Sequence, residues 1–166
     1  MNLKTLSQLQ TEIDASGGKY QLTYNDLQVV AQHIVASIPR DCSLVAILRG
    51  GSALGQLVAY YTAKPLHVFY PSIGEVYPPL PPGSLPVFIE DVVAQGRTYN
   101  IVAAKFQDFL FAPAVIDAGM YPLTNSIVSL VTKTWVVFPH ENFDLTLAGD
   151  RGMFRDGTSQ NSKAIL

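Results

Sequence analysis

The sequence contains a single cysteine, Cys42, and this scarcity excludes two classes of protein. One cysteine cannot close an intramolecular disulfide or supply a cysteine-rich zinc site, so the chain is not a disulfide scaffold. We expect Cys42 to be a small buried residue rather than a nucleophile. The three histidines, His33, His67 and His140, lack the spacing of metal ligands, and we expect them to be structural or surface residues.

Charge is also sparse, because Asp, Glu, Lys and Arg make up 14% of the chain and the net charge is −2. This balance gives no general attraction to nucleic acid or to an anionic membrane, so any affinity for phosphate must be local. The sequence has no apolar run long enough to span a bilayer, no secretory signal, no Walker loop and no Gly-x-Gly-x-x-Gly motif. We expect a soluble cytoplasmic protein that binds neither nucleic acid nor membrane.

Hydrophobic residues, in contrast, make up 48% of the 166 residues, which is enough for one sizeable core. We therefore expect a single domain over residues 1–166. Segments with helical and strand patterns alternate, which predicts an α/β fold with a mainly parallel, twisted sheet flanked by helices. The expected helices are 3–14, 24–38, 52–62 and 98–110, and the expected strands are 43–48, 66–70, 86–90, 113–117 and either 127–131 or 134–138.

The most informative segment is an apolar strand that ends in two acids. Val87-Phe-Ile89 is typical of a central parallel strand, and Glu90 and Asp91 follow at its carboxyl end, where open α/β sheets bind ligands. Thr98 can cap a helix beginning near Tyr99, so backbone N–H groups could converge on one anion. Taken alone, the segment is equally consistent with an ordinary strand end and a capped helix. The loop after the acids consists of Ala94, Gln95, Gly96, Arg97 and Thr98.

A second candidate anion site follows the expected strand 43–48. Arg49 supplies a fixed positive charge, and Gly50 and Gly51 permit a close backbone approach before a helix that begins at Ser52. A βα turn with glycines for geometry alone is the alternative.

These two segments resemble the motifs of type I phosphoribosyltransferases, which bind 5-phosphoribosyl 1-pyrophosphate (PRPP). The resemblance implies that Glu90 and Asp91 hold the ribose hydroxyls and help to place a Mg²⁺ ion. It also implies that Arg49 and the two glycines hold the pyrophosphate, and that loop 94–98 holds the 5′-phosphate. Gln95 stands where threonine is usual in the family. The resemblance further implies a small hood built from the terminal segments, and a homodimer or homotetramer.

The segment from Lys133 to Glu141 resembles the base-binding segment of hypoxanthine and xanthine-guanine phosphoribosyltransferases. The resemblance implies that Trp135 stacks on the base, that Val136 contacts the base edge through its backbone, and that Glu141 lies near the pyrophosphate or the metal. From the residues alone, a lone tryptophan in a β segment is more often part of a core.

The activity implied is transfer of the 5-phosphoribosyl group from PRPP to a nucleobase, with a purine favoured, in nucleotide salvage. Glu90, Asp91 and Arg49 would be the catalytic residues, and Mg²⁺ the cofactor. Ala94 stands where 6-oxopurine enzymes usually carry an aspartate that assists proton transfer, and a methyl group cannot accept a proton. A regulatory protein that binds PRPP or a nucleotide without turnover, and an enzyme acting on another phosphorylated sugar, are the alternatives.

We also state expectations for two further segments, 71–83 and 149–166. Residues 71–83 contain five prolines and neither lysine nor arginine, in the position where this family carries a mobile loop. They form a lid or a stiff surface spacer, with a proline-rich motif for a partner protein as the third alternative. The polar tail 149–166 is expected to be mobile.

Overall fold

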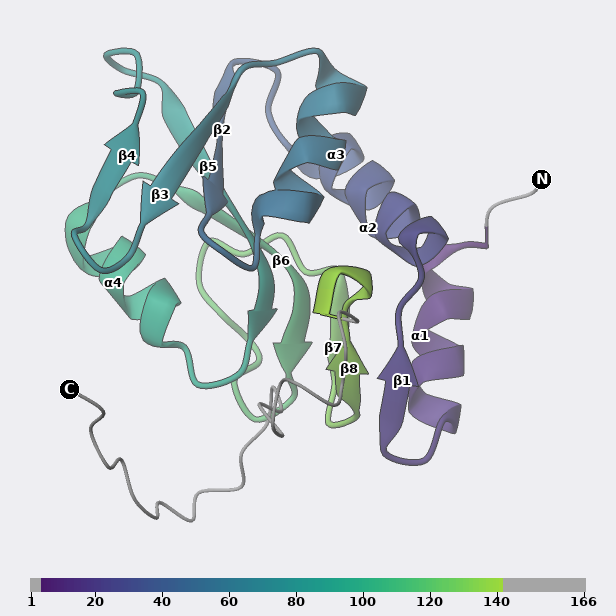
Figure 1. Cartoon of the computed structure of the whole chain (residues 1–166). Coiled ribbons are helices and arrows are strands. Elements are labelled where there is room, and N and C mark those ends of the chain that lie inside the picture. Colours follow the sequence, from purple (N-terminus) through teal and green to yellow (C-terminus); the bar gives the residue numbers. More distant parts are fainter. Residues whose placement is uncertain (1–3, 142–166) are drawn as a thin grey trace, which may run out of the picture.

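The computed structural model describes residues 4–141 and has four α-helices, eight strands and a short 3₁₀ helix in that range (Figure 1). The helices are α1 (Leu6–Ala15), α2 (Tyr24–Ser37), α3 (Ser52–Thr62) and α4 (Arg97–Lys105), with the 3₁₀ helix η1 at Pro139–Glu141. The strands are β1 (Lys19–Gln21), β2 (Cys42–Ile47), β3 (Leu66–Tyr70), β4 (Glu75–Tyr77), β5 (Leu85–Val93), β6 (Leu110–Asp117), β7 (Leu130–Thr132) and β8 (Trp135–Val137).

The central sheet has six strands in the order β4-β3-β2-β5-β6-β7. All its pairs are parallel except β3 with β4, so the predicted α/β fold with a mainly parallel sheet is confirmed. Successive residues of β5 alternate between two cores. Val87 and Ile89 pack with α1, α2 and α3 on one face, and Phe88 packs with Val102 of α4 on the other. Helices therefore cover both faces, and the strand ends are left free for a site.

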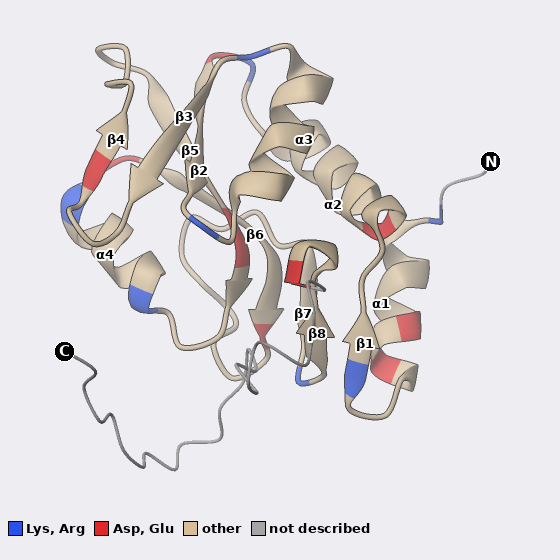
Figure 2. Cartoon of the chain, in the orientation of Figure 1, with Lys and Arg blue, Asp and Glu red and all other residues tan. Residues whose placement is uncertain are grey.

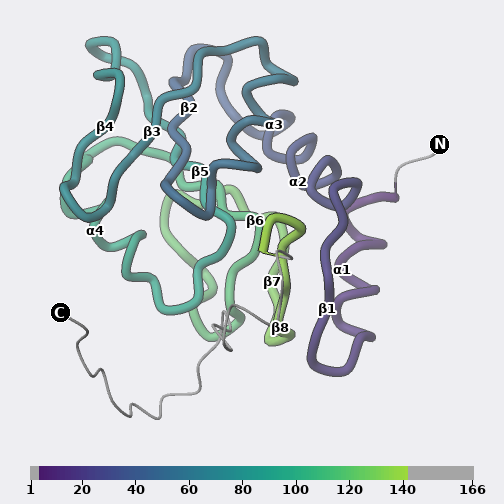
Figure 3. The backbone as a smooth tube through the Cα atoms, in the orientation of Figure 1, coloured from purple at the N-terminus to yellow at the C-terminus, as the bar shows by residue number. Residues whose placement is uncertain are grey.

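A small second sheet forms the hood. In it, β1 pairs in parallel with β8, and Lys19 lies opposite Trp135. The tube in Figure 3 shows the purple start of the described chain running beside its yellow-green end. The hood predicted from the terminal segments is confirmed.

Several elements differ from the sequence expectations. Strand β5, expected at 86–90, runs on to Val93 because Val92 and Val93 still pair with β6, so Glu90 and Asp91 lie within the strand rather than after it. The predicted helix 98–110 ends at Lys105, because Phe106 takes an extended conformation and its ring packs on Phe88 with centroids 4.8 Å apart. Strand β6 consequently begins at Leu110 rather than at 113. Strands β1 and β4 were not predicted, and both of the alternative strands near the end form, as β7 and β8.

The proline-rich segment 71–83 is anchored to the edge of the sheet. It contains β4, which pairs antiparallel with β3, and His67 Nδ1 lies 2.7 Å from the Pro78 carbonyl oxygen. Lys105 also donates to the Gly74 carbonyl. These contacts favour the spacer over the lid. The tail 149–166 lies outside the described residues.

The structure also bears on two sequence expectations, one for Cys42 and one for membrane-spanning segments. Cys42 is buried and unpaired with any other cysteine, as expected of a small core residue. Within residues 4–141, no helix combines the length and the hydropathy needed to cross a bilayer.

An ion pair joins Lys4, just before α1, to the buried Asp26 of α2, and it leads to a stability prediction. Asp26 is 1% exposed and its Oδ1 lies 2.9 Å from Lys4 Nζ. We expect Lys4→Met to lower the free energy of unfolding by about 1–3 kcal/mol, because it leaves a buried carboxylate unpaired and the lysine is itself partly exposed. Urea denaturation measures the change. Glu12→Gln, which removes the exposed partner of the same lysine, should destabilise the protein clearly less than Lys4→Met.

The pH dependence follows from the same pair. Burial acts to raise the pKa of Asp26, but hydrogen bonds from Thr23 and the contact with Lys4 outweigh it and lower the pKa. A carboxyl group with a lowered pKa stabilises the folded state above its unfolded pKa and loses this effect as pH falls through the folded value. The destabilisation by Lys4→Met should therefore be full at neutral pH and shrink below about pH 4. An equal loss of stability in Lys4→Met at pH 3 and at pH 7 would contradict this prediction.

Candidate active site

The two candidate anion sites of the sequence form one site. Strands β2 and β5 are neighbours, and Ala46 lies opposite Ile89, so the residues that follow β2 lie beside Glu90 and Asp91 in the last part of β5. A Cβ atom added at Gly50 would overlap the Asp91 carboxylate, and one added at Gly51 would overlap the Ile89 carbonyl oxygen. The corner formed by Arg49, Gly50 and Gly51 is therefore packed directly against the end of β5.

The two acids differ in environment. Glu90 is 6% exposed, and burial, followed by the nearby charge of Asp91, raises its pKa well above the ordinary value. Its Oε1 accepts a hydrogen bond from the Asp91 N–H at 3.2 Å. Asp91 is less buried, and its Oδ1 accepts from the Val92 N–H at 2.7 Å. Two adjacent carboxyl groups, one of them destabilised when charged, form a place that favours a cation.

Two helices begin at this edge without a side-chain cap. The N-cap residues are Gly51 for α3 and Gly96 for α4, and neither helix has a side-chain cap hydrogen bond. In α1 and α2, by contrast, capping boxes that begin with Thr5 and Thr23 satisfy the first N–H groups. At α3 the Ser52 N–H already donates to the Arg49 carbonyl at 3.2 Å, so the N–H groups after it and those at the start of α4 are the ones left to bind an anion.

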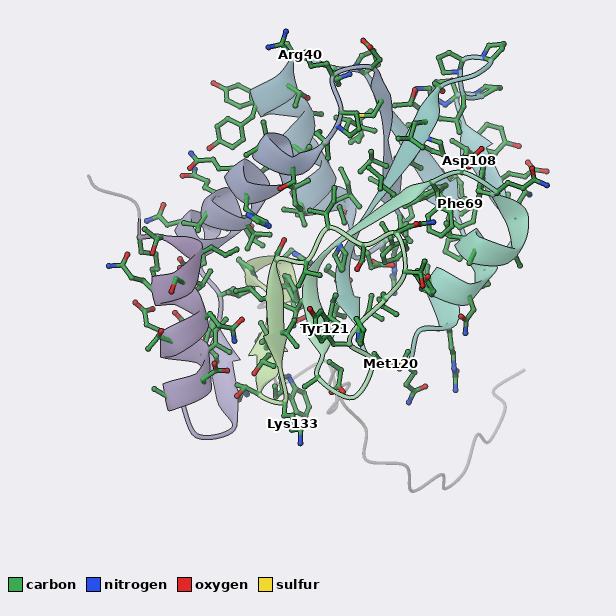
Figure 4. The ribbon with its side chains drawn as sticks, turned by 180° about the vertical axis from the view of Figure 1, so that it is seen from behind. Arg40, Phe69, Asp108, Met120, Tyr121 and Lys133 are labelled. Carbon is green, nitrogen blue, oxygen red and sulfur yellow. The ribbon has the colours of Figure 1, made fainter. Side chains whose placement is uncertain are left out.

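The expectation that Thr98 caps the helix is wrong. Helix α4 already begins at Arg97, because Gly96 takes the left-handed conformation with φ of 68° and turns the chain into the helix earlier. A Cβ atom at Gly96 would also lie 2.5 Å from Met120 Cε, on the turn that follows β6 (Figure 4). Gly96 is buried beneath this turn, and Ala94 and Thr98 are partly exposed. Gln95 is exposed, so its amide can reach a ligand bound at the loop.

The cationic side chains of the site are exposed and unpaired. Arg49 and Arg97 lie beside the N-termini of α3 and α4, and neither forms an ion pair with another residue of the described range 4–141. Figure 2 shows that charged residues are few and scattered along the ribbon. Since no carboxylate of the described residues pairs with either arginine, both side chains are available to anions bound at the two helix N-termini.

Solved structures share this architecture. A purine phosphoribosyltransferase from Pyrococcus horikoshii matches with a TM-score of 0.61 at 19% identity, covering 76% of this chain and 96% of that one. A hypothetical protein from Neisseria gonorrhoeae with bound ppGpp matches at 0.56 and 16%, covering 76% and 91%. The Helicobacter pylori xanthine-guanine-hypoxanthine phosphoribosyltransferase matches at 0.54 and 13%, covering 75% and 94%.

The chain has the type I phosphoribosyltransferase fold. Identities of this size establish the fold alone. No protein-family model matches the chain, and no curated protein matches it.

The hood of the phosphoribosyltransferase fold brings to the site a residue that sequence reasoning missed. His140 Nε2 lies 3.8 Å from Asp91 Oδ2, and this contact raises the pKa of His140 against the opposing effect of burial. The only signal in the sequence was its position next to Glu141. Expected to be structural or on the surface, His140 instead connects η1 of the hood to the acid at the end of β5.

Glu141 has a local partner in the structure. Its Oε2 accepts a hydrogen bond from the Phe138 N–H at 2.9 Å. Among the described residues, no group of three or more His, Cys, Asp or Glu side chains could hold a metal ion. Glu90, Asp91 and Glu141 therefore do not form a ready-made metal cluster.

The predicted base-binding residues lie on β8 of the hood. Trp135 is partly exposed. Its backbone N–H donates to the Gly18 carbonyl at 3.0 Å, and the backbone N–H of Leu22 donates to the Val137 carbonyl. Since alternate residues of a parallel strand bond to the same neighbour, the N–H and C=O of Val136 point away from β1. Val136 is fully buried, backbone included, so none of it is exposed to a ligand in this structure.

Proposed function

We propose that this protein transfers the 5-phosphoribosyl group from PRPP to a nucleobase, with a purine favoured, and releases pyrophosphate. The observation that carries the proposal is the pair of helix N-termini without side-chain caps, together with two acids in the last part of β5, beside the turn that follows β2. PRPP carries one phosphate and one pyrophosphate on opposite sides of a ribose with two hydroxyls, and this arrangement offers a partner for each part.

The assignment of each part follows the two helices. The pyrophosphate binds at Gly50, Gly51 and the N-terminus of α3, with Arg49 alongside, and the 5′-phosphate binds at loop 94–98 and the N-terminus of α4. Between them, Glu90 and Asp91 bind the ribose hydroxyls, because carboxylate oxygens accept hydrogen bonds from hydroxyl groups.

A magnesium ion fits the same two acids. Mg²⁺ is commonly held by one or two carboxylates together with substrate phosphates and water, rather than by a complete protein cage. Glu90 and Asp91 supply that number of carboxylates, with Glu141 as the third residue that the family resemblance implies. When bound, the ion would supply positive charge to the pyrophosphate.

The chain itself contributes positioning and charge stabilisation. In the reaction, the bond from ribose C1 to the pyrophosphate oxygen breaks, its electrons leave with the pyrophosphate, and a base nitrogen forms the new bond to C1. The proton of that nitrogen is released to water, since Ala94 offers no acceptor. Arg49 and the N–H groups of the α3 corner stabilise the charge that develops on the leaving group. Fixing the ribose through Glu90 and Asp91 aligns C1 with the attacking nitrogen.

The base binds under the hood. Trp135 is partly exposed and supplies an aromatic face. The backbone contact with the base edge that the family resemblance implies for Val136 requires this fully buried residue to become accessible when the base binds. Nucleobases stack on aromatic side chains with a free energy of about 1–3 kcal/mol each. This site suits a purine, since its larger ring system overlaps more of the indole.

The test is pyrophosphate release from PRPP and Mg²⁺ with a panel of purine and pyrimidine bases. We expect release that depends on the base and is fastest with one purine. Release that does not depend on any base would indicate a hydrolase of phosphorylated sugars.

A second candidate is a regulatory protein that binds PRPP or a nucleotide without turnover. Ala94 lacks a group that accepts a proton, which favours this candidate, and one protein of the same fold has ppGpp bound. PRPP binding without release in the presence of every base would support it.

Trp135→Ala tests the base site. We expect KM for the base to rise about 10-fold or more, because stacking is lost, whereas stabilisation of the protein by PRPP and Mg²⁺ against heat should persist. Trp135→Phe should recover most of the loss, since it retains an aromatic face. Equal weakening of base use and PRPP binding in Trp135→Ala would instead indicate a role in packing the hood.

A further inference from the structure

A pocket of about 530 Å³ opens beside the candidate active site and is not used by the proposed reaction. Its lining residues come from the start of α2, one face of α3 and η1, and they are Tyr24, Leu27, Ser52, Ala53, Gln56, Leu57, Tyr60 and His140. The volume lies within the range of small-molecule sites, which are mostly apolar with a few polar groups.

The pocket is continuous with the pyrophosphate end of the site. Ser52 and Ala53 are the first two residues of α3, and His140 is the residue that contacts Asp91. From Ser52 to Tyr60 the pocket follows eight residues of the helix, which is about 12 Å at the usual rise. This length exceeds what a pyrophosphate group alone would occupy.

The far part of the pocket is aromatic. Tyr24 is 60% exposed and Tyr60 is 80% exposed, and they come from different helices. Exposed tyrosines offer flat apolar faces with a polar end, which suits a ligand ring that is partly in water. Gln56 lies between the two ends and makes no side-chain hydrogen bond to any other described residue, so its amide can pair with a base edge.

PRPP cannot fill this part of the pocket. In the proposed reaction the nucleobase attacks ribose C1 from the side opposite the pyrophosphate, so the acceptor base also lies elsewhere, beside Trp135. A ligand that uses both the α3 N-terminus and the tyrosines must carry a diphosphate at one end and an aromatic ring at the other.

We infer that this pocket binds a nucleoside diphosphate, with its diphosphate at the α3 N-terminus and its base against Tyr60 and Tyr24, in competition with PRPP. The inference rests on the proposed function for the diphosphate position. Its consequence is inhibition of the transferase by a purine nucleotide that is not the reaction product.

The test compares GDP, ADP, inorganic pyrophosphate and adenosine by isothermal titration with the full chain. We expect one of the two nucleoside diphosphates to bind at least 10-fold more tightly than pyrophosphate, and PRPP to displace it. Tyr60→Ala should remove this advantage and leave the affinity for pyrophosphate within about twofold. Because Tyr60 is so exposed, the variant is expected to fold.

Tyr121→Ala is the matched control, because Tyr121 is a 50% exposed tyrosine on the turn after β6 and does not line the pocket (Figure 4). It should leave every affinity unchanged. The inference is overturned if nucleoside diphosphates bind no more tightly than pyrophosphate, or if Tyr60→Ala weakens all ligands equally. It is also overturned if Tyr60→Ala halves the particle mass in solution, since the pocket is then a contact between copies of the chain.

Failure of the inference and failure of the proposed function give different results. Nucleotide binding that depends on Tyr60, without any base-dependent pyrophosphate release, rejects the transferase and keeps the pocket. Base-dependent release with no extra affinity for nucleoside diphosphates rejects the pocket and keeps the transferase.

Discussion

Replacing Gly51 by alanine is expected to lower the free energy of unfolding by about 1–3 kcal/mol and to abolish stabilisation by PRPP. The added Cβ would overlap the carbonyl oxygen of Ile89 and lie 3.0 Å from that of Ile47, and both are backbone atoms of paired strands. Neither atom can move without separating β2 from β5. Urea denaturation measures the first effect, and the thermal shift with PRPP and Mg²⁺ measures the second.

Gly50→Ala is the matched variant next to it. Its Cβ would meet the carboxylate of Asp91, which is a side chain and can rotate away. We therefore expect a loss of stability under about 1 kcal/mol, but a loss of PRPP affinity of at least about 10-fold, because the displaced carboxylate no longer meets the ribose. If Gly51→Ala were as stable as the natural chain, the described packing of this corner would be wrong. If Gly50→Ala retained the PRPP shift, Asp91 would lie outside the site.

The sequence was sufficient to predict the strands that build this corner, although β5 runs on to Val93 instead of ending at 90. Apolar runs such as Val87-Phe-Ile89 identify buried parallel strands, and the polar residues that follow them fall at one edge of the sheet. Local signals of this kind also predicted α3 at 52–62 and β3 at 66–70, as observed. These elements are defined by neighbouring residues, so their positions can be read without knowing the rest of the fold.

Elements that depend on distant partners could not be predicted in the same way. Strand β1 has three residues, and its partner β8 lies more than 100 residues away. The contact of His140 with Asp91 likewise depends on how the hood sits on the sheet. The cap at Thr98 failed for a local reason, because the conformation of Gly96 moved the helix start by two residues. Long-range strand pairing and the backbone conformation of single glycines are therefore what the sequence alone could not predict.

Glu90→Gln is expected to have two opposite effects, and their combination distinguishes a binding role from a structural one. In the ligand-free protein at pH 8 we expect the variant to be more stable by about 1 kcal/mol, which corresponds to about 2–4 °C in Tm. Burial and the charge of Asp91 make the ionised form of Glu90 unfavourable, and glutamine removes that charge without changing the shape. Pyrophosphate release, in contrast, should fall about 100-fold or more.

The pH dependence of the stability gain has a definite sign. The folded pKa of Glu90 is raised, so the group stabilises the folded state fully below its unfolded pKa and loses this effect as pH rises through the folded value. The difference in Tm between Glu90→Gln and the natural chain should therefore be near zero at pH 4 and grow toward pH 8. A difference that is the same at both pH values would show that the charge of Glu90 is not its cause.

Adding PRPP and Mg²⁺ should reverse the order of stability at pH 8. A ligand that binds only the folded state raises stability by about 2.7 kcal/mol at 100 times its Kd, and the natural chain should gain this while Glu90→Gln should not. Asp108→Asn serves as the control, because Asp108 is an exposed acid remote from the site and should change neither stability nor ligand response (Figure 4). If Glu90→Gln is stabilised by PRPP as strongly as the natural chain, Glu90 does not contact the ligand, and Asp91 alone must hold the ribose and the metal.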